Sequence, residues 1–210
     1  MKISRNMNLV IPVETELGRA YVHATPISKE VYREHFFILG KVFSAIFSEG
    51  LGVVAGPRVA YLMLERTCLD TKAGDGNVWE GPHGVRNTLV NEIIRLSNLV
   101  YPVEGKGWDT KPLEVAVERE IVDLDDVIGE LVFFTCISSI NKPAQASGLM
   151  EAVSGMWNSQ TSFLSLTDWM RSLPISKPDA SSGETAITSS APSSTTAPAQ
   201  DLATSGFIPE

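Results

Sequence analysis

The chain has too few basic residues for a protein whose main partner is a polyanion. It contains 17 Lys and Arg residues against 25 Asp and Glu residues, which gives a formal net charge of −8 at pH 7. Binding to DNA, RNA or an anionic membrane requires Lys and Arg to neutralise phosphate. The composition therefore predicts a protein that has neither nucleic acid nor a membrane as its partner.

Cysteine and histidine are also scarce, which argues against most metal and redox chemistry. The two cysteines, Cys68 and Cys136, stand in apolar helical settings that are typical of buried, reduced thiols. The three histidines lack the i, i+3 or i, i+4 spacing of a helical metal site. Asp123, Asp125 and Asp126 resemble the start of a calcium loop, but the required glycine and glutamate do not follow. We expect no bound metal.

No catalytic signature is present: the chain lacks a G-x-S-x-G motif, a Walker loop and a nucleophilic cysteine motif. Gly50–Ala55 fits the G-x-G-x-x-A pattern of dinucleotide sites, which requires a preceding strand. A helix is predicted there instead, so a connection between helices is the better interpretation. Glu118 and Glu120 could form an acid–base pair, but two charged residues on a short surface helix are more often simply exposed to solvent. The sequence predicts a protein that is not an enzyme and has no cofactor.

No apolar run is long enough to cross a membrane. The longest, Val127–Ile140, is interrupted by Glu130 and by hydroxyl side chains. The N-terminal run Leu9–Val13 is shorter than the apolar region of a secretory signal. We expect the protein to remain in the cytoplasm where it is made.

What the sequence does contain is helical periodicity around one central apolar segment. Val122–Ile140 begins with carboxylates that suit a helix N-terminus and is then apolar on nearly every side, which predicts a buried helix. A buried strand over Leu131–Ile137 is the alternative, because short apolar runs are ambiguous by period alone. Residues at three- and four-residue spacing, including Phe36 and Leu62, predict the core faces of other helices.

These helices are expected at residues 28–48, 58–71, 85–100, 112–121, 143–157 and 165–173. Ser28 is the expected cap of the first, Pro57 suits the first turn of the second, and Ser165–Asp168 resembles a capping box for the last. Residues 103–111, which include Trp108, are expected to form a loop.

The two ends of the chain differ from this helical pattern. Leu9–Val13 and Arg19–His23 flank a turn ending in Gly18, which predicts a β-hairpin. After Pro174, Ser, Thr, Ala and Pro dominate, and such a segment cannot bury enough apolar surface to offset its ordering entropy. The predicted fold class is therefore mainly α: a helical domain at residues 1–174 with a small N-terminal hairpin, then a disordered tail at residues 175–210.

Large apolar residues gather near the C-terminal end of the predicted domain. Aromatic and methionine side chains are favoured at adaptable protein-binding surfaces. The alternative is that these residues close the core of the domain, because a stripe of apolar residues is more often part of a core than of a binding surface. The candidate partner-binding residues are Trp157, Phe163, Leu164, Trp169 and Leu173.

The segment Pro112–Pro174 resembles the tail assembly chaperones of long-tailed bacteriophages. The matching pieces are PLEVAVEREI, DVIGELVFFTCISSI, GLMEAVSGMW and SQTSFLSLTDWMRSLP, and VWEGPHGVRNTLVNEIIRLSNLVYP and EGLGVVAGPRVAYLML match more loosely. The resemblance implies an acidic helical protein of the host cytoplasm that binds the tape measure protein while tail tube subunits polymerise. The major tail protein and further copies of this chain are additional candidate partners.

An alternative function is that of a structural virion protein in the tail or at the head–tail connection. The N-terminal hairpin would then pair with a neighbouring molecule by adding strands to its sheet.

Overall fold

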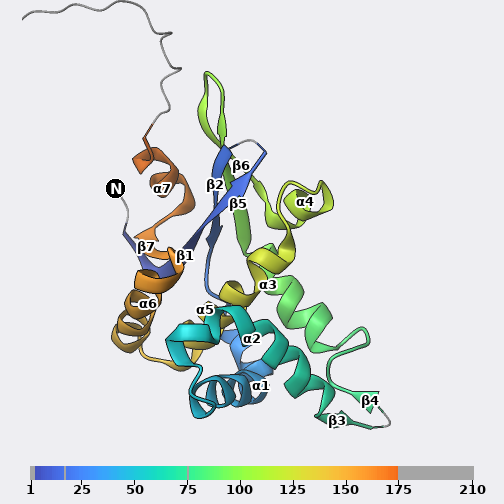
Figure 1. Cartoon of the computed structure of the whole chain (residues 1–210). Helices are drawn as coiled ribbons and strands as arrows, with labels where there is room; N and C mark the ends of the chain where they lie inside the picture. The colour runs from blue at the N-terminus through green and yellow to red at the C-terminus, as the bar shows by residue number, and fades with distance from the viewer. Residues whose placement is uncertain (1–2, 17, 75, 175–210) are drawn as a thin grey trace, which may run out of the picture. The chain divides into compact units, whose positions relative to one another are not determined.

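The computed structural model describes residues 3–16, 18–74 and 76–174 (Figure 1), so the predicted tail lies outside the described residues. The helices are α1 (Lys29–Ser48), α2 (Gly52–Leu69), the π-helix η1 (Arg86–Val90), α3 (Asn91–Arg95), α4 (Leu113–Glu118), the short 3-10 helix η2 (Leu124–Asp126), α5 (Ile128–Ile140), α6 (Pro143–Trp157) and α7 (Leu166–Ser172). The strands are β1 (Ile3–Thr15), β2 (Gly18–Ala24), β3 (Lys72–Ala73), β4 (Gly76–Asn77), β5 (Ser97–Val103), β6 (Gly107–Pro112) and β7 (Gln160–Leu164).

A five-stranded antiparallel sheet forms one layer of the fold, so the prediction of a mainly α domain is wrong. The strand order is β6-β5-β2-β1-β7, and the hairpin predicted to be a small addition lies at the centre of the sheet. The helix predicted at residues 85–100 ends at Arg95, and Ser97–Val103 forms β5. Leu99 and Val100 are both fully buried, on opposite faces of the sheet. A strand covered on both faces loses the alternation that would identify it.

The N-terminal hairpin itself is confirmed. Val10 pairs with His23 and Ile11 with Val22, and Gly18 supplies the left-handed backbone of the turn with φ +96°. Because successive side chains point to opposite faces, the two strands serve two cores. The main core takes Leu9, Ile11, Ala20 and Val22, and the other face carries Val10, Tyr21 and His23.

Helix α5 lies at the centre of the main core, as its apolar character predicted, and the strand alternative is excluded. Between Ile128 and Ile137, Glu130 is the one residue that is not fully buried. Two glycines allow α5 and α2 to come close together. A Cβ atom added at Gly129 would overlap the carbonyl oxygen of Pro57, and one added at Gly56 would lie 2.5 Å from the ring of Phe133.

Helix α7 covers the opposite face of the sheet and makes a second, smaller core (Figure 1). The predicted cap at Ser165 is confirmed, since the Asp168 N–H donates to Ser165 Oγ at 3.2 Å. The second bond differs from that of a capping box: Asp168 Oδ2 accepts from the Ser165 hydroxyl, at 2.9 Å, in place of the main-chain N–H of the cap residue. The second core consists of Val10, Val100 and Trp169, with Tyr21, Trp108, Leu164, Leu166, Met170 and Leu173 packed around them.

Two further predictions are settled by the described residues. Cys68 and Cys136 are buried free thiols, and burial raises the pKa of each to about 12, which keeps both protonated and unreactive. Helix α2 begins at Gly52, before the predicted start at Arg58, so Pro57 lies inside the helix and not in its first turn. None of the described helices combines the length and the apolar character needed to cross a membrane.

The close approach of α2 and α5 predicts opposite effects for two glycine substitutions. Gly129→Ala should lower the free energy of unfolding by about 2 kcal/mol or more, because backbone atoms must move to admit the methyl group. Gly148→Ala is the control, since its Cβ on α6 would have no atom within 4 Å. Gly148→Ala should raise the free energy of unfolding by about 0.5–1 kcal/mol, because alanine is favoured over glycine inside a helix. Urea unfolding measures both, and a shift of both variants in the same direction would contradict the packing described here.

Candidate functional site

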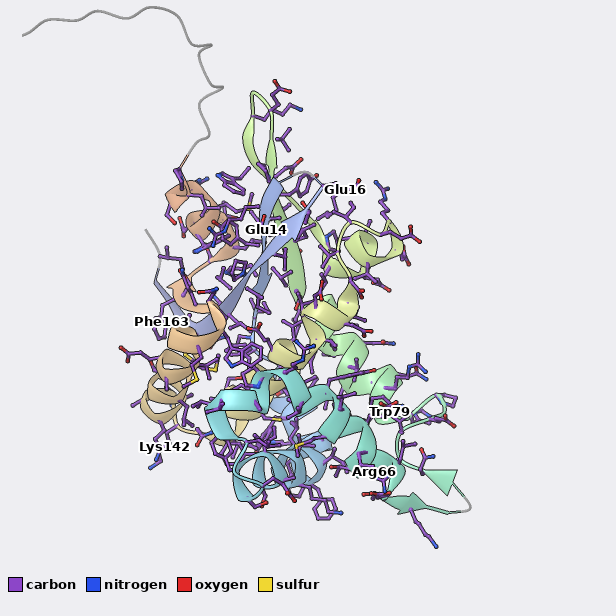
Figure 2. The ribbon with its side chains drawn as sticks, viewed as in Figure 1. Glu14, Glu16, Arg66, Trp79, Lys142 and Phe163 are labelled. Atoms are coloured by element: carbon purple, nitrogen blue, oxygen red, sulfur yellow. The ribbon has the colours of Figure 1, made fainter. Side chains whose placement is uncertain are left out.

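The five residues predicted to bind a partner do not share one surface. Trp157 is half-buried at the end of α6 and packs on the main core, whereas Phe163 is 42% exposed on β7 (Figure 2). Leu164, Trp169 and Leu173 belong to the second core under α7, where Trp169 is only 8% exposed. Their role in binding stays a prediction, and Trp169 could reach a partner only if α7 moved.

Trp157 completes the hydrogen bonding of another helix. Pro57 has no N–H, so the carbonyl of Val53, one turn earlier in α2, lacks its usual helical donor. The indole N–H of Trp157 donates to this carbonyl at 3.2 Å. A partly buried carbonyl is therefore satisfied by a residue from α6, which gives Trp157 a structural role that its apolar spacing did not indicate.

An aromatic cluster, Tyr21, Trp108 and Trp169, lies between the sheet and α7. The Tyr21 ring is 5.3 Å from that of Trp169 and 5.6 Å from that of Trp108, measured between centroids. The indole N–H of Trp108 donates to the Pro174 carbonyl at 2.9 Å. This bond ties the last described residue to β6. The sequence analysis placed residue 108 in a loop and did not identify the cluster.

Glu130 is a partly buried carboxyl on α5, beside the main core. Its Oε2 atom is buried without a hydrogen-bond partner among the described residues. Two cavities share it. One, of about 360 Å³, is lined by Arg58, Tyr61 and Trp157, and the other, of about 350 Å³, runs along β1 past Glu14, a residue labelled in Figure 2.

Burial raises the pKa of Glu130 to about 7, and the neighbouring Ser159 side chain lowers it in part. Ser159 is itself fully buried, and its hydroxyl reaches no partner with good hydrogen-bond geometry in the described part of the chain. Asp123, Asp125 and Asp126 line the same cavities. A carboxyl of this kind exchanges a proton near neutral pH and is a candidate for function. The sequence analysis treated it only as an interruption of an apolar run.

The other polar motifs are not assembled into sites. Glu118 and Glu120 are exposed at the end of α4, and Glu118 lines a surface cavity of about 380 Å³ beside Arg95. Gly50–Ala55 joins α1 to α2, so a helix and not a strand precedes its first glycine. Within residues 3–16, 18–74 and 76–174, no cluster of three or more His, Cys, Asp or Glu residues could hold a metal ion.

The outer helices expose several large apolar side chains. Phe36 and Leu62, predicted to face the core, are 58% and 60% exposed, because both helices are apolar on more than one side. The Lys41 ammonium lies over the ring of Phe37, 4.5 Å from its centroid. The exposed set is Phe36, Phe37, Val54, Leu62, Leu69, Met156 and Phe163, with exposures from 42% to 64%.

Comparison with family models, curated proteins and solved structures finds no match.

The bond from Trp157 to Val53 predicts an energetic coupling between Trp157 and Pro57. Trp157→Phe should lower the free energy of unfolding by more in the wild-type chain than in the Pro57→Ala background. In that background the alanine N–H can donate to the Val53 carbonyl in place of the indole. A double-mutant cycle by urea unfolding should give a coupling of about 1 kcal/mol. An equal cost of Trp157→Phe in both backgrounds would show that the indole contributes only its size.

The raised pKa of Glu130 predicts a pH-dependent gain from Glu130→Gln. A pKa raised in the folded state stabilises the fold below the unfolded value near 4.5, and this contribution is lost as pH rises through about 7. The neutral glutamine should therefore be more stable than wild type at pH 8, by up to about 3 kcal/mol, with the difference vanishing toward pH 4.5. Melting curves of both proteins across this range test it. Glu151→Gln, at an exposed position of α6, is the control. A Glu130→Gln protein less stable than wild type at pH 8 would mean that the carboxylate is favourably paired.

Proposed function

We propose that this chain is an assembly chaperone of the kind that serves long-tailed bacteriophages, and that it binds the tape measure protein in the host cytoplasm. The observation that carries the proposal is the exposed apolar surface of α1 and α2. Val54, Leu62 and Leu69 recur at spacings close to two helical turns, so they lie on one side of α2. Phe36 and Phe37 add two aromatic rings on α1, which packs against α2.

This surface suits a long helical partner with an apolar stripe. An amphipathic helix docks by placing side chains at i, i+3, i+4 and i+7 into a complementary apolar surface. Among the described residues, five of the seven exposed large apolar side chains lie on this one pair of helices, and such a concentration points to a binding surface. The resemblance of Pro112–Pro174 to tail assembly chaperones supports the same partner class.

In this proposal the chain binds and releases its partner without a chemical step and without a cofactor. Its net charge of −8 disfavours capture of nucleic acid and helps to keep the unbound protein dispersed. The major tail protein and further copies of this chain are secondary partners of the proposal. Because α1 and α2 are the surface invoked, the residues near α7 are not required for binding.

The alternative of a structural virion protein has less support from the geometry. It relied on the β1–β2 hairpin adding strands to a neighbour. Both strands of the hairpin already have partners inside the sheet, β2 with β5 and β1 with β7.

Co-purification with the tape measure protein encoded by the same genome tests the proposal. The double variant Phe37→Ser, Leu62→Ser should bind at least tenfold more weakly, a loss of about 1.4 kcal/mol or more, because two exposed apolar contacts are removed. Its melting temperature should stay close to that of wild type, since both side chains are solvent-exposed.

Phe163→Ser is the matched control, an exposed aromatic residue on β7 away from the proposed surface. Full-strength binding by the double variant would contradict the α1–α2 surface. Loss of binding in Phe163→Ser alone would move the site to the C-terminal residues. Recovery of the protein in purified virions would favour the structural alternative.

A further inference from the structure

His23 is enclosed between the sheet and α7. It lies on β2 in the middle of the sheet and has no exposed surface. Its imidazole ring is 5.7 Å from the indole of Trp169, between centroids. Neither Nδ1 nor Nε2 has a partner with good hydrogen-bond geometry within the described chain, although an imidazole always carries at least one N–H donor. Such a buried and unpaired group is costly to the fold, and it needs an explanation.

The surroundings of His23 contain no charge that could stabilise an imidazolium. Across the strands it pairs with Val10 of β1 and Asn98 of β5. From α7 it meets Trp169, while the charged residues of that helix, Asp168 and Arg171, form an ion pair with each other at 3.7 Å.

Burial is the main reason that the pKa of His23 is lowered, and main-chain groups of Leu164 and His23 itself oppose this only in part. The Leu164 carbonyl, which has two lone pairs, also accepts a hydrogen bond from Asn8 Nδ2 at 2.8 Å. No described charged side chain contributes to the pKa of His23, and on the same face the ring of Tyr21 contacts Trp169.

Helix α7 is the element whose departure would give His23 access to water. It has seven residues, and it is held by the second core, apart from the main core around α5. Trp169 is its buried anchor, and the bond from Trp108 to Pro174 holds its C-terminal side. A short element fixed by one buried side chain is expected to open locally at a lower free energy than the rest of the fold.

We propose that α7 is a latch on the sheet, closed while His23 is neutral and opened when its imidazole takes up a proton. Protonation turns both ring nitrogens into donors, and it places a positive charge in an apolar core, a cost that the main-chain groups of Leu164 and His23 offset only in part. Opening places the imidazolium in water. The open state exposes the apolar sheet face around Val10, Tyr21 and Val100, and it frees Trp169. The latch does not depend on the proposed chaperone function.

The sign of the effect follows from the lowered pKa of His23 in the closed state. The closed state excludes the proton that the open state binds with an ordinary pKa near 6.5. The ratio of open to closed molecules should therefore begin to rise as pH falls below about 6.5, by up to tenfold for each pH unit, and level off below the closed-state pKa.

Hydrogen exchange of the full chain between pH 8 and pH 5 tests the latch, after correction for the intrinsic pH dependence of exchange. The Trp169 amide, which donates to the Ser165 carbonyl at 2.8 Å, and the Trp108 indole N–H report on α7. Amides of α5 report on the main core. We expect both α7 probes to lose protection below pH 6.5, by up to tenfold per unit, while α5 keeps its protection.

His23→Phe should abolish this response, because its ring stays neutral at every pH. His35→Phe is the matched control, a buried histidine on α1, and should leave the response of α7 unchanged. Measurements in the Glu130→Gln background separate the latch from the titration of that carboxyl.

Protection of α7 that does not change between pH 8 and pH 5 in the wild-type chain would overturn the proposal, whether or not His23→Phe folds. Loss of protection in α5 at the same pH as in α7 would also overturn it, since His23 would then govern the whole fold. So would an unchanged pH response in a folded His23→Phe protein.

Discussion

The contact between α2 and α5 is the constraint on which the rest of the structure depends. Gly129 of α5 lies against the main chain of α2 at Pro57, where even a methyl group would not fit. The proline that lies in this contact also removes a helical hydrogen bond, and Trp157 of α6 replaces it. Helix α6 is thereby fixed to the helical layer, and the chain turns at Asn158, with φ +56°, directly into β7. The contact of α6 with α2 therefore sets the position of β7, which is one edge strand of the sheet.

The sheet divides the apolar residues of the chain between two cores of unequal size. The main core holds α5 and most of the large buried side chains, whereas the second core rests on Trp169 and a few residues of the central strands. The parts of such a domain unfold locally with different free energies. Within the described part of the chain, the buried polar groups without a well-formed hydrogen bond also divide between the cores: Glu130 and Ser159 lie near the main core, and His23 lies under α7.

Features specified by neighbouring residues could be predicted from the sequence, and features specified by distant ones could not. The N-cap of α1 at Ser28, the N-cap of α7 at Ser165 and the turn at Gly18 are all local, and each was predicted. Strand β7 was missed because its pairing partner is β1, at the other end of the chain. Strand β5 was missed because burial on both faces gave it a continuous apolar run instead of alternation.

The sites follow the same rule. The burial of Glu130 is created by β1 and α2, and the partner of Trp157 exists only because Pro57 lies in another helix. Neither feature can be inferred from the residues that are adjacent to these side chains in the sequence. Helix α2 was predicted, but the exposure of Leu62 depends on which side of the helix its neighbours cover.

The bond between Trp108 and Pro174 gives the chain a defined mechanical anchor. A pulling force applied at Pro174 would act on the indole–carbonyl bond to β6, a strand at one edge of the sheet, and through the covalent main chain on α7. Trp108 and Trp169 both belong to the second core. Tension at Pro174 therefore reaches the second core along two routes.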